Sequence, residues 1–272
     1  MPFELFLFTT DAARIAAADA AGMDGYVVDW EWMGKDRRQA GADTQINHDT
    51  VDDLRRVRGA TRGRVLCRVN GFGDHTEREV DEAVDAGADE LLLPMVRSPR
   101  EVEAVLGQVR ERCGVGILVE TVAALGHLPE LGRLPLSRAY VGLNDLAIER
   151  RTPELFRAVV DGTLEHIRPH FPMAFGFAAL TVPEAGAPVP CRLLLSEMAR
   201  LECRFGFLRR SFHRDVRDAH LPPALARLRQ AFEQAAARGA DACARDRAEL
   251  EVSVRSHPVT LFEESWPSPI LS

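Results

Sequence analysis

The feature that most constrains the fold is a regular alternation of short apolar runs with amphipathic segments. The apolar runs lie at residues 3–9, 25–30, 64–69, 89–95, 115–120, 138–143, 174–180 and 203–208. Near-continuous apolar runs of this length are typical of strands that are buried on both faces, as in parallel sheets. Eight such strands alternating with helices in a chain of 272 residues predict the α/β class and a (β/α)₈ TIM barrel.

Capping residues and apolar spacing predict helices between these runs. Ser98 precedes Pro99 and is followed by Glu101, which predicts a capping box at the start of a helix that ends near residue 109. Thr152 and Pro153 predict the start of a single helix that extends to residue 167. An open doubly wound sheet is the rival architecture, but no G-x-G-x-x-G turn follows the first run.

We expect the barrel to occupy residues 1–220 and a C-terminal helical extension to occupy residues 221–272. One helix is predicted at about 222–238 and a second to about residue 252. The final segment carries the apolar residues Leu261, Phe262, Trp266 and Ile270. These side chains need burial, either against a neighbouring subunit or against the chain's own barrel.

Charge and composition exclude several classes of function. The net charge of −7 disfavours a general affinity for nucleic acid. The sequence has no run of eighteen apolar residues, so we expect no membrane span. The first residues lack the basic segment of a signal peptide. The five cysteines form no C-x-x-C pair, so we expect reduced thiols in a cytoplasmic protein. Lys35 is the only lysine and hence the sole candidate for a Schiff base.

Polar residues gather where the predicted strands end, which is where (β/α)₈ barrels carry their active sites. The strand ends carry Asp29, Trp30, Glu31 and Trp32; then Arg68 and Asn70; then Pro94 and Met95; then Glu120; then Gly142, Asn144 and Asp145; then Thr181; and finally Arg209, Arg210 and Ser211. Charge at the mouth of a barrel is costly unless it is paired or binds a ligand. The sequence therefore predicts a functional site at this end.

Glu120 and Asp145 are 25 residues apart, which is one strand–helix unit, so they are expected at the ends of adjacent strands about 4.8 Å apart. Two carboxylates this close repel each other unless one takes a proton or a cation lies between them. A hard divalent ion, Mg²⁺ by default or Mn²⁺, accepts such ligands. The alternative is that one acid caps a helix while the other pairs with an arginine.

Arg68 and the tryptophans have two interpretations each. The Arg68 guanidinium could bind a carboxylate or stabilise a developing enolate oxygen, or it could form an ion pair with a neighbouring acid. Trp32 could line the pocket and stack on a substrate, or both Trp30 and Trp32 could pack against helices outside the barrel. Arg209 or Arg210 could bind an anionic substrate end, although Arg–Asp pairing on the surface is preferred.

Four stretches together resemble the HpcH/HpaI aldolase and citrate lyase β-subunit family. They are "GYVVDWE", "CRVNGFGDHTEREVDEAVDAGADELLLPMVRSPREVEAVL", "GILVETVAAL" and "YVGLNDLAI". The resemblance is close over residues 3–150 and loose over residues 170–215. It implies a Mg²⁺-dependent carbon–carbon lyase or aldolase on a (β/α)₈ barrel, with Glu120 and Asp145 as metal ligands and Arg68 as the family's arginine. It also implies a homo-oligomer, either a trimer or a hexamer.

The implied substrate is a small acidic molecule, a 2-keto acid whose carbon–carbon bond breaks to leave an enolate. The metal would act as a Lewis acid, and Arg68 would add positive charge beside the enolate oxygen. Backbone N–H groups from Gly142 through Leu143 to Asn144 could hold the substrate carboxylate.

A base must also remove the proton of the leaving half, and three residues are candidates. His48 lies close to where the aldolase branch places its catalytic histidine, or it simply precedes a helix capped by Asp49 or Thr50. Asp29 and Glu31 resemble the D-x-E of the citrate lyase branch, but Trp32 replaces that branch's next acid. The chain thus mixes features of both branches.

Two rival functions stay open alongside the lyase prediction. One is a different enolate or thioester reaction on the same barrel, such as citryl-CoA or malyl-CoA lyase chemistry or a hydrolase. The other is a barrel subunit that has lost catalysis.

Overall fold

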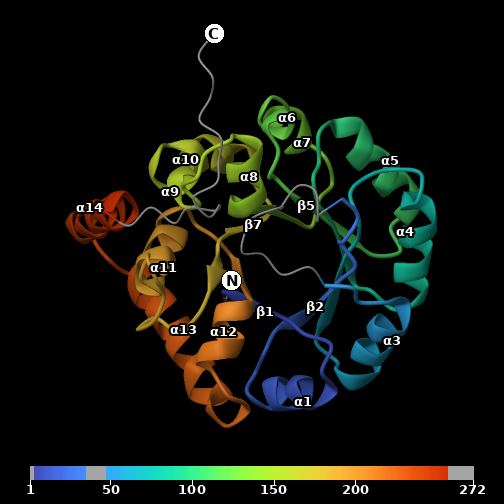
Figure 1. The fold of residues 1–272 in the computed structure, drawn as a ribbon, viewed down its shortest axis with the longest axis horizontal. Helices are drawn as coiled ribbons and strands as arrows, with labels where there is room; N and C mark the ends of the chain where they lie inside the picture. Colours follow the sequence, from blue (N-terminus) through green and yellow to red (C-terminus); the bar gives the residue numbers. More distant parts are fainter. Residues whose placement is uncertain (1–2, 35–46, 257–272) are drawn as a thin grey trace.

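The structure is a computed structural model that describes residues 3–34 and 47–256. Its sheet has nine strands, all paired in parallel, in the order β7-β6-β5-β4-β3-β2-β1-β9-β8. The strands are β1 (Glu4–Phe8), β2 (Gly25–Asp29), β3 (Arg64–Arg68), β4 (Glu90–Leu93), β5 (Gly114–Leu118), β6 (Arg138–Val141), β7 (Ala174–Phe177), β8 (Ala179–Leu180) and β9 (Phe205–Leu208). They form a nearly closed barrel with helices around it (Figure 1), which confirms the predicted fold.

The barrel closes through the segment that was expected to be its seventh strand. Residues 174–180 do not form one strand, because the backbone at Ala178 turns into the left-handed region with φ of 57°. The residues before the turn form β7 and pair with β6, whereas those after it form β8 and pair with β9. A backbone hydrogen bond of 2.9 Å from Arg204 N to Phe175 O also joins the two sides. One segment therefore spans the join and serves both neighbours.

The helices that surround the barrel follow the strands in sequence. They are α1 (Ala12–Ala20), α3 (Val51–Ala60), α4 (Thr76–Asp85), α5 (Pro99–Val109), α6 (Val122–Leu125), α7 (Leu128–Leu131), α8 (Leu143–Glu149), α9 (Arg157–Val160), α10 (Thr163–Ile167), α11 (Cys191–Arg200), α12 (Arg210–Asp215), α13 (Leu221–Ala236) and α14 (Ala240–Ser256), with short 3₁₀ turns at Arg168–His170 and Asp218–His220. None of the helices in the described parts of the chain is long and apolar enough to cross a membrane.

Two helix predictions need correction. The helix expected over residues 152–167 is two short helices, α9 and α10, because Gly162 between them adopts a left-handed φ of 89°. The helix α5 begins at Pro99 as expected, but Ser98 makes no side-chain capping bond. Instead, Glu101 accepts the Arg97 N–H at 2.8 Å, so the carboxylate reaches one residue further back than a capping box requires.

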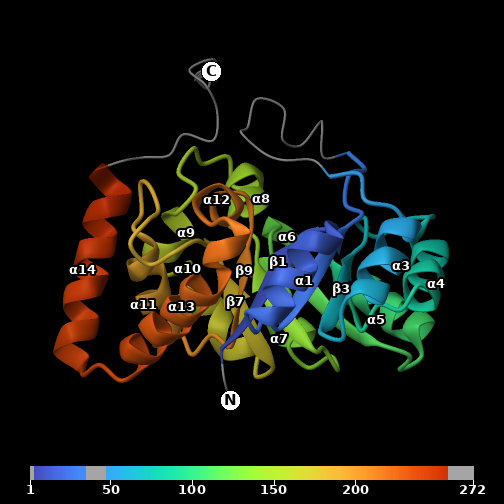
Figure 2. The same cartoon turned by 90° about the horizontal axis from the view of Figure 1, so that it is seen from below.

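The C-terminal helices occupy two different positions. Helix α13 packs against α11 and α1 in the ring around the barrel, whereas α14 packs against α11 and α9 at the periphery (Figures 1 and 2). Buried Glu197 of α11 forms an ion pair with Arg247, which attaches α14 to the barrel, and a second one with Arg200 of its own helix. The predicted apolar segment around Trp266 lies outside the described residues, so its burial stays a prediction.

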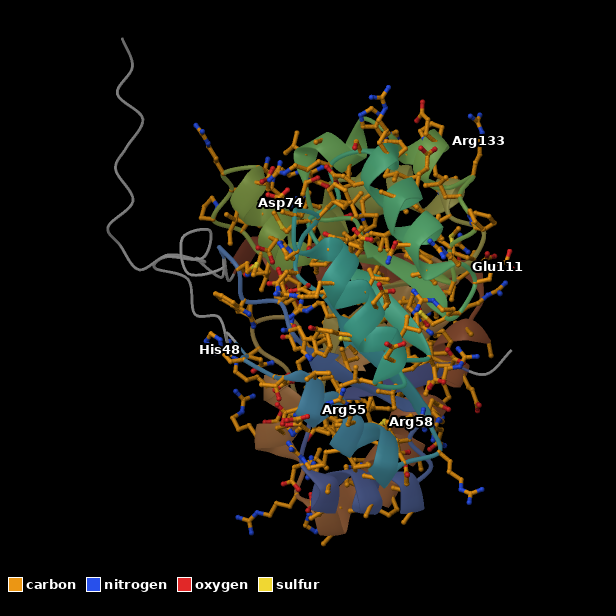
Figure 3. All side chains as sticks on the ribbon, turned by 90° about the vertical axis from the view of Figure 1, so that its right-hand side faces the viewer. His48, Arg55, Arg58, Asp74, Glu111 and Arg133 are labelled. Carbon is orange, nitrogen blue, oxygen red and sulfur yellow. The ribbon has the colours of Figure 1, made fainter. Side chains whose placement is uncertain are left out.

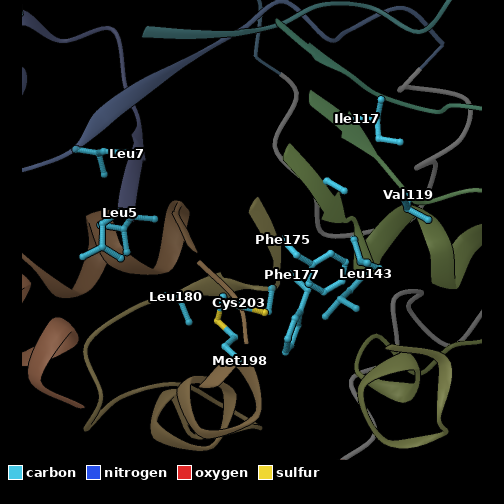
Figure 4. Packing of buried hydrophobic residues seen from close by; sticks show 14 of the residues in the cluster. Leu5, Leu7, Ile117, Val119, Leu143, Phe175, Phe177, Leu180, Met198 and Cys203 are labelled. Atoms are coloured by element: carbon cyan, nitrogen blue, oxygen red, sulfur yellow. The ribbon is translucent and has the colours of Figure 1, made fainter. Parts of the chain in front are cut away.

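Two apolar cores lie on the two sides of the barrel wall. The larger core packs the outward faces of the strands against the helices, and Leu5, Ile117 and Phe175 belong to it (Figure 4). The smaller core fills the barrel interior with Phe6, Val27, Leu66, Leu92, Leu118, Tyr140, Phe205 and Phe207. Alternation along each strand divides the side chains between the two cores, which is why the runs are apolar throughout.

A buried ion pair closes the barrel below its interior core. Arg138 of β6 donates to Glu90 of β4, and both side chains are almost completely inaccessible. The guanidinium carbon lies 4.5 Å from the ring centroid of Phe6 and 4.6 Å from that of Phe205. Ser137 donates a further hydrogen bond of 2.8 Å to the same carboxylate. Charge at this end of the barrel is thus matched internally by Glu90 and Arg138, with two aromatic faces beside it.

The strand directions define two ends of the molecule. Figure 3 shows His48 and Asp74, which follow β2 and β3, near one end, and Glu111 and Arg133, which precede β5 and β6, near the other. The first end carries the carboxyl ends of the strands and is where the polar residues predicted from the sequence are found. The second end is closed by Arg138 and Glu90.

We expect Glu90→Leu to lower the free energy of unfolding by about 3–5 kcal/mol, because it leaves the buried Arg138 charge with only the Glu4 carboxylate, at 3.9 Å. The double variant Glu90→Leu/Arg138→Met should recover most of this loss, since it removes both charges. Urea denaturation measures the effect. The exposed pair of Arg55 with Asp52 provides the control, and Arg55→Ala should cost only about 0–1 kcal/mol. Equal losses in the single and double variants would contradict this account.

Candidate active site

Glu120 stands at the carboxyl end of β5 with its side chain turned into the barrel mouth. A backbone bond of 2.8 Å from Val119 N to Tyr140 O prolongs the pairing with β6 up to the residue before it. The side chain is buried, with 2 % of its surface exposed. Its Oε1 accepts the Met95 N–H at 2.9 Å, and Met95 adopts a left-handed φ of 55°. This strained backbone directs the N–H at the carboxylate.

Asp145 reaches the same region from the first turn of α8, which follows β6 directly. It is buried, as Glu120 is. Gly142 lies between the two acids, and a Cβ added there would fall far inside van der Waals contact with Glu120 Oε2. Glycine at this position therefore leaves the space in which the Glu120 carboxylate lies. The predicted juxtaposition of Glu120 and Asp145 at adjacent strand ends agrees with this geometry.

The two acids influence each other electrostatically. Burial raises the pKa of Glu120 well above its ordinary value, and the Asp145 and Glu31 charges raise it further, whereas the Met95 N–H and Arg68 lower it. Within the described residues, Glu120 makes no ion pair with an arginine within 4 Å. A buried carboxylate beside a second carboxylate is unfavourable unless a proton or a cation is present.

The donor set at this position suits a hard divalent cation. The described residues hold no group of three or more His, Cys, Asp and Glu side chains arranged around a metal position. Glu120 and Asp145 form a pair of oxygen donors, and Mg²⁺ is commonly held by one or two protein carboxylates with water and substrate at its other positions. The raised pKa of Glu120, to which the neighbouring Asp145 charge contributes, fits such an ion.

Arg68 is held rigidly by two acids from the neighbouring strand. Its Nε and Nη2 donate to the two oxygens of Asp29 at 2.7 and 2.6 Å, and its Nη1 lies 3.1 Å from Glu31 Oε2. These acids raise the pKa of Arg68 against the opposing effect of burial. These contacts agree with the interpretation of Arg68 as part of an ion pair. The role of Arg68 at an enolate oxygen stays a prediction. The guanidinium carbon also lies 5.4 Å from the Phe8 ring centroid.

Asp29 forms hydrogen bonds with several neighbouring groups. Besides Arg68, it accepts the Asn47 Nδ2–H at 3.0 Å and the Glu31 N–H at 3.3 Å, and it is fully buried. The Asp29 N–H itself donates to Asp49 Oδ2 at 2.9 Å. These contacts assign Asp29 to orienting Arg68; the prediction that Asp29 or Glu31 acts catalytically is not tested by them.

Asn70 is a structural residue that joins three elements at the mouth. Its backbone N–H and its Nδ2 donate to the two oxygens of Glu79 in α4, at 3.0 and 2.8 Å. Its Oδ1 accepts the N–H groups of Trp32 and Met33, at 3.0 and 2.8 Å. Asn70 therefore fixes the backbone that follows β2. Glu79 lies nine residues away on a helix face, and no sequence signal identified it as a partner.

The two tryptophans after β2 have different surroundings. Trp30 is buried in the outer core, as the packing alternative predicted. Trp32 is 45 % exposed, and its ring centroid lies 5.9 Å from that of the exposed His48. The helix after His48 is capped by Thr50 through a capping box with Asp53, in agreement with the structural interpretation of this stretch. Lys35 lies outside the described residues, so its prediction as a Schiff-base candidate stays open.

Arg209 differs from the preferred sequence interpretation, which placed it in a surface ion pair. It is partly buried, and its guanidinium carbon lies 4.6 Å from the centroid of the Phe8 ring. Burial lowers the pKa of Arg209, and the nearby Arg68 charge lowers it further. The surface Arg–Asp pair of this stretch is formed instead by Arg214 and Asp215, at 2.8 Å. Only the fold shows that Arg209 packs on the ring of Phe8 at the end of β1.

Fold and site together define a parallel α/β barrel with buried acids and arginines at the carboxyl ends of its strands. The model of the HpcH/HpaI aldolase/citrate lyase family matches residues 3–131, which are 129 of the 272 residues. The predicted resemblance to that family is confirmed over these residues. This match supports a function of the carbon–carbon lyase type. No curated protein matches the sequence.

Solved structures of the same fold are similar over most of the chain. An HpcH/HpaI aldolase/citrate lyase family protein from Burkholderia cenocepacia J2315 has 15 % identity and a TM-score of 0.58, covering 86 % of this chain and 94 % of its own. The HpcH/HpaI aldolase from Desulfitobacterium hafniense DCB-2 has 13 % identity and a TM-score of 0.56, covering 76 % and 86 %. The citrate synthase SbnG has 16 % identity and a TM-score of 0.58, covering 85 % and 95 %. At these identities the likeness establishes the fold.

The raised pKa of Glu120 predicts a pH dependence of stability in metal-free buffer. The folded protein holds this proton above the ordinary value of 4.5, where the unfolded chain has released it. The resulting stabilisation is complete below pH 4.5 and is lost as the pH rises through the folded pKa. Glu120→Gln is neutral throughout, so this variant should melt higher than the wild type near neutral pH, by about 2–4 °C for each kcal/mol gained.

Thermal melting from pH 4.5 to pH 8 tests this expectation, and the difference between Glu120→Gln and wild type should shrink towards pH 4.5. Exposed Glu111 offers a matched control, since Glu111→Gln should follow the wild-type curve. A Glu120→Gln variant that melts lower than wild type at pH 8 in the presence of a chelator would contradict the electrostatic account.

Proposed function

We propose that the protein is a metal-dependent carbon–carbon lyase or aldolase that cleaves or forms a bond next to the keto group of a small 2-keto acid. The observation that carries the proposal is the pair of buried carboxylates, Glu120 and Asp145, at adjacent strand ends. The match of residues 3–131 to the model of the HpcH/HpaI aldolase/citrate lyase family supports the reaction class. Mg²⁺, or Mn²⁺ in its place, is the proposed cofactor, with these two residues as its protein ligands.

When bound, Mg²⁺ supplies Lewis-acid stabilisation of negative charge on the oxygens of the substrate. The chain provides the rest of the site. The first N–H groups of a helix lack acceptors within it, so the backbone from Gly142 to Asn144 at the start of α8 can bind the carboxylate of the keto acid. Leu143 contributes only its backbone, because its side chain lies in the outer core (Figure 4).

Arg68 is proposed to stabilise the enolate that forms when the carbon–carbon bond breaks. Asp29 and Glu31 bind Nε, Nη2 and Nη1, yet each terminal nitrogen carries two hydrogens, so one N–H on each can still donate. A guanidinium that is already oriented pays no reorganisation cost during the reaction. This explains why the chain places two acids behind one arginine.

The base that removes the proton from the leaving half is proposed among His48, Glu31 and Asp29. His48 is exposed at the mouth beside Trp32, where an incoming substrate can reach both rings. Glu31 and Asp29 are buried and bound to Arg68, so their contacts favour positioning over proton transfer. This comparison favours His48, with Trp32 as a neighbouring apolar wall.

We expect Glu120→Gln and Asp145→Asn to abolish tight Mn²⁺ binding, because each replaces an anionic ligand with a neutral one. Isothermal titration with Mn²⁺ measures the affinity, and product analysis with candidate 2-keto acid aldols measures turnover. Glu149→Gln on the same helix as Asp145 is the control, since Glu149 pairs with Arg97 on the surface. Unchanged turnover in Glu120→Gln, or in excess chelator, would rule out the proposed function.

Gly142→Ala should weaken Mn²⁺ binding at least tenfold while the barrel stays folded. The new methyl group would occupy the space of Glu120 Oε2 and displace that carboxylate. Gly59→Ala is the matched control, because no atom lies within 4 Å of a Cβ added at Gly59 in α3. That control should keep the affinity and gain up to about 1 kcal/mol of stability. Wild-type Mn²⁺ affinity in Gly142→Ala would exclude the assigned position of the ion.

A further inference from the structure

A cavity of about 320 Å³ opens between the ends of β1, β2 and β9. Phe8 and Val27 line its lower part, and Thr9, Arg209 and Arg210 are among the residues of its polar wall. Phe8 also contacts Arg68, so the cavity and the candidate active site share this ring. A molecule bound at the acids can therefore extend towards the end of β9.

Arg209 brings a positive charge into this cavity without a matching acid. Within residues 3–34 and 47–256 it forms no ion pair or hydrogen bond through its guanidinium, and its contact is with the face of the Phe8 ring at 4.6 Å. Partial burial removes water from the group, and an aromatic face repays only part of that loss. The planar guanidinium fork is suited to a carboxylate, which it binds through two parallel hydrogen bonds.

The acids of the mouth do not neutralise Arg209. Asp29 and Glu31 both bind Arg68, so the negative charge nearest to Arg209 is already engaged. The Asp29 charge and the Glu31 charge each raise the pKa of Arg209 by less than the Arg68 charge lowers it. Two guanidinium groups next to the Phe8 ring thus leave the β9 side of the mouth positive.

The other polar groups of the cavity are compatible with an anion. The Thr9 hydroxyl accepts the Asp11 N–H at 3.2 Å, so its own hydrogen is free to donate into the cavity. Asp49 turns one oxygen to the Asp29 N–H, and burial raises the pKa of Asp49. His213 donates from Nε2 to the Phe8 carbonyl at 2.8 Å, which leaves this ring nitrogen occupied.

We propose that Arg209 binds a second carboxylate at the far end of the substrate, so that the protein prefers 2-keto acids with two carboxylates. This inference rests on the proposed function for the position of the keto-acid end. It assigns this role to Arg209, which follows β9 and which the sequence left as one of two candidates for an anionic substrate end. The Thr9 hydroxyl supports the distal carboxylate, and the Phe8 ring contacts both Arg68 and Arg209, the arginines proposed for the two ends of the substrate.

Isothermal titration with two ligands of equal chain length tests the inference. 2-Oxoglutarate carries a distal carboxylate, and 2-oxopentanoate has a methyl group in its place. Wild type should bind 2-oxoglutarate at least about tenfold more tightly, since a hydrogen-bonded charge pair is worth about 1.5–3 kcal/mol. Arg209→Met should remove this preference and leave the 2-oxopentanoate affinity unchanged. Arg209→Lys should restore part of it, because the charge stays and the fork is lost.

Arg214→Met is the control variant, because Arg214 lies on the adjoining helix α12 and pairs with Asp215 at the surface. It should keep the wild-type preference. Equal binding of the two ligands to wild type, or an equal loss of both in Arg209→Met, would overturn the inference. Mn²⁺ titration of the same samples is a separate readout. Absent Mn²⁺ binding defeats the proposed function, while the ligand preference measured without metal still decides the role of Arg209.

Discussion

A carboxylate buried beside a second carboxylate is unfavourable in a folded protein, and Glu120 is in that position at the mouth of this barrel. The surrounding structure is built to keep it there. Met95 adopts a left-handed backbone that directs its N–H at Glu120, and Gly142 omits the side chain that would displace it. Under the proposed function, a divalent cation held by both acids would offset the cost of this arrangement.

Buried charges are paired differently at the two ends of the barrel. At the amino ends of the strands, Arg138 and Glu90 neutralise each other between two phenylalanine rings, so that end is structurally complete. At the carboxyl ends, Arg68 is bound by two acids, while Glu120 and Arg209 lack ion pairs among the described residues. Under the two proposals made above, Glu120 would help to hold a metal ion and Arg209 would bind an anionic substrate end.

Much of the fold was predictable because it follows from local pattern. The apolar runs identified the strands, and their alternation with helices gave the barrel, since a parallel sheet needs helices on its outer face. The break at Ala178 was not predictable, because it arises where one segment must pair with both β6 and β9 to close the barrel. The split at Gly162 was a missed local signal, since glycine favours the left-handed backbone found there.

The sequence by itself determined which residues stand at the strand ends, and thus the acids Glu120 and Asp145 and the arginine Arg68, because strand position depends on neighbours along the chain. Only the tertiary structure decided which side chains pair. Asn70 binds Glu79, Asp29 and Glu31 bind Arg68, and Arg209 faces Phe8. These choices depend on distances between segments far apart in sequence and on how much water each charge loses, and neither quantity is encoded in a local pattern.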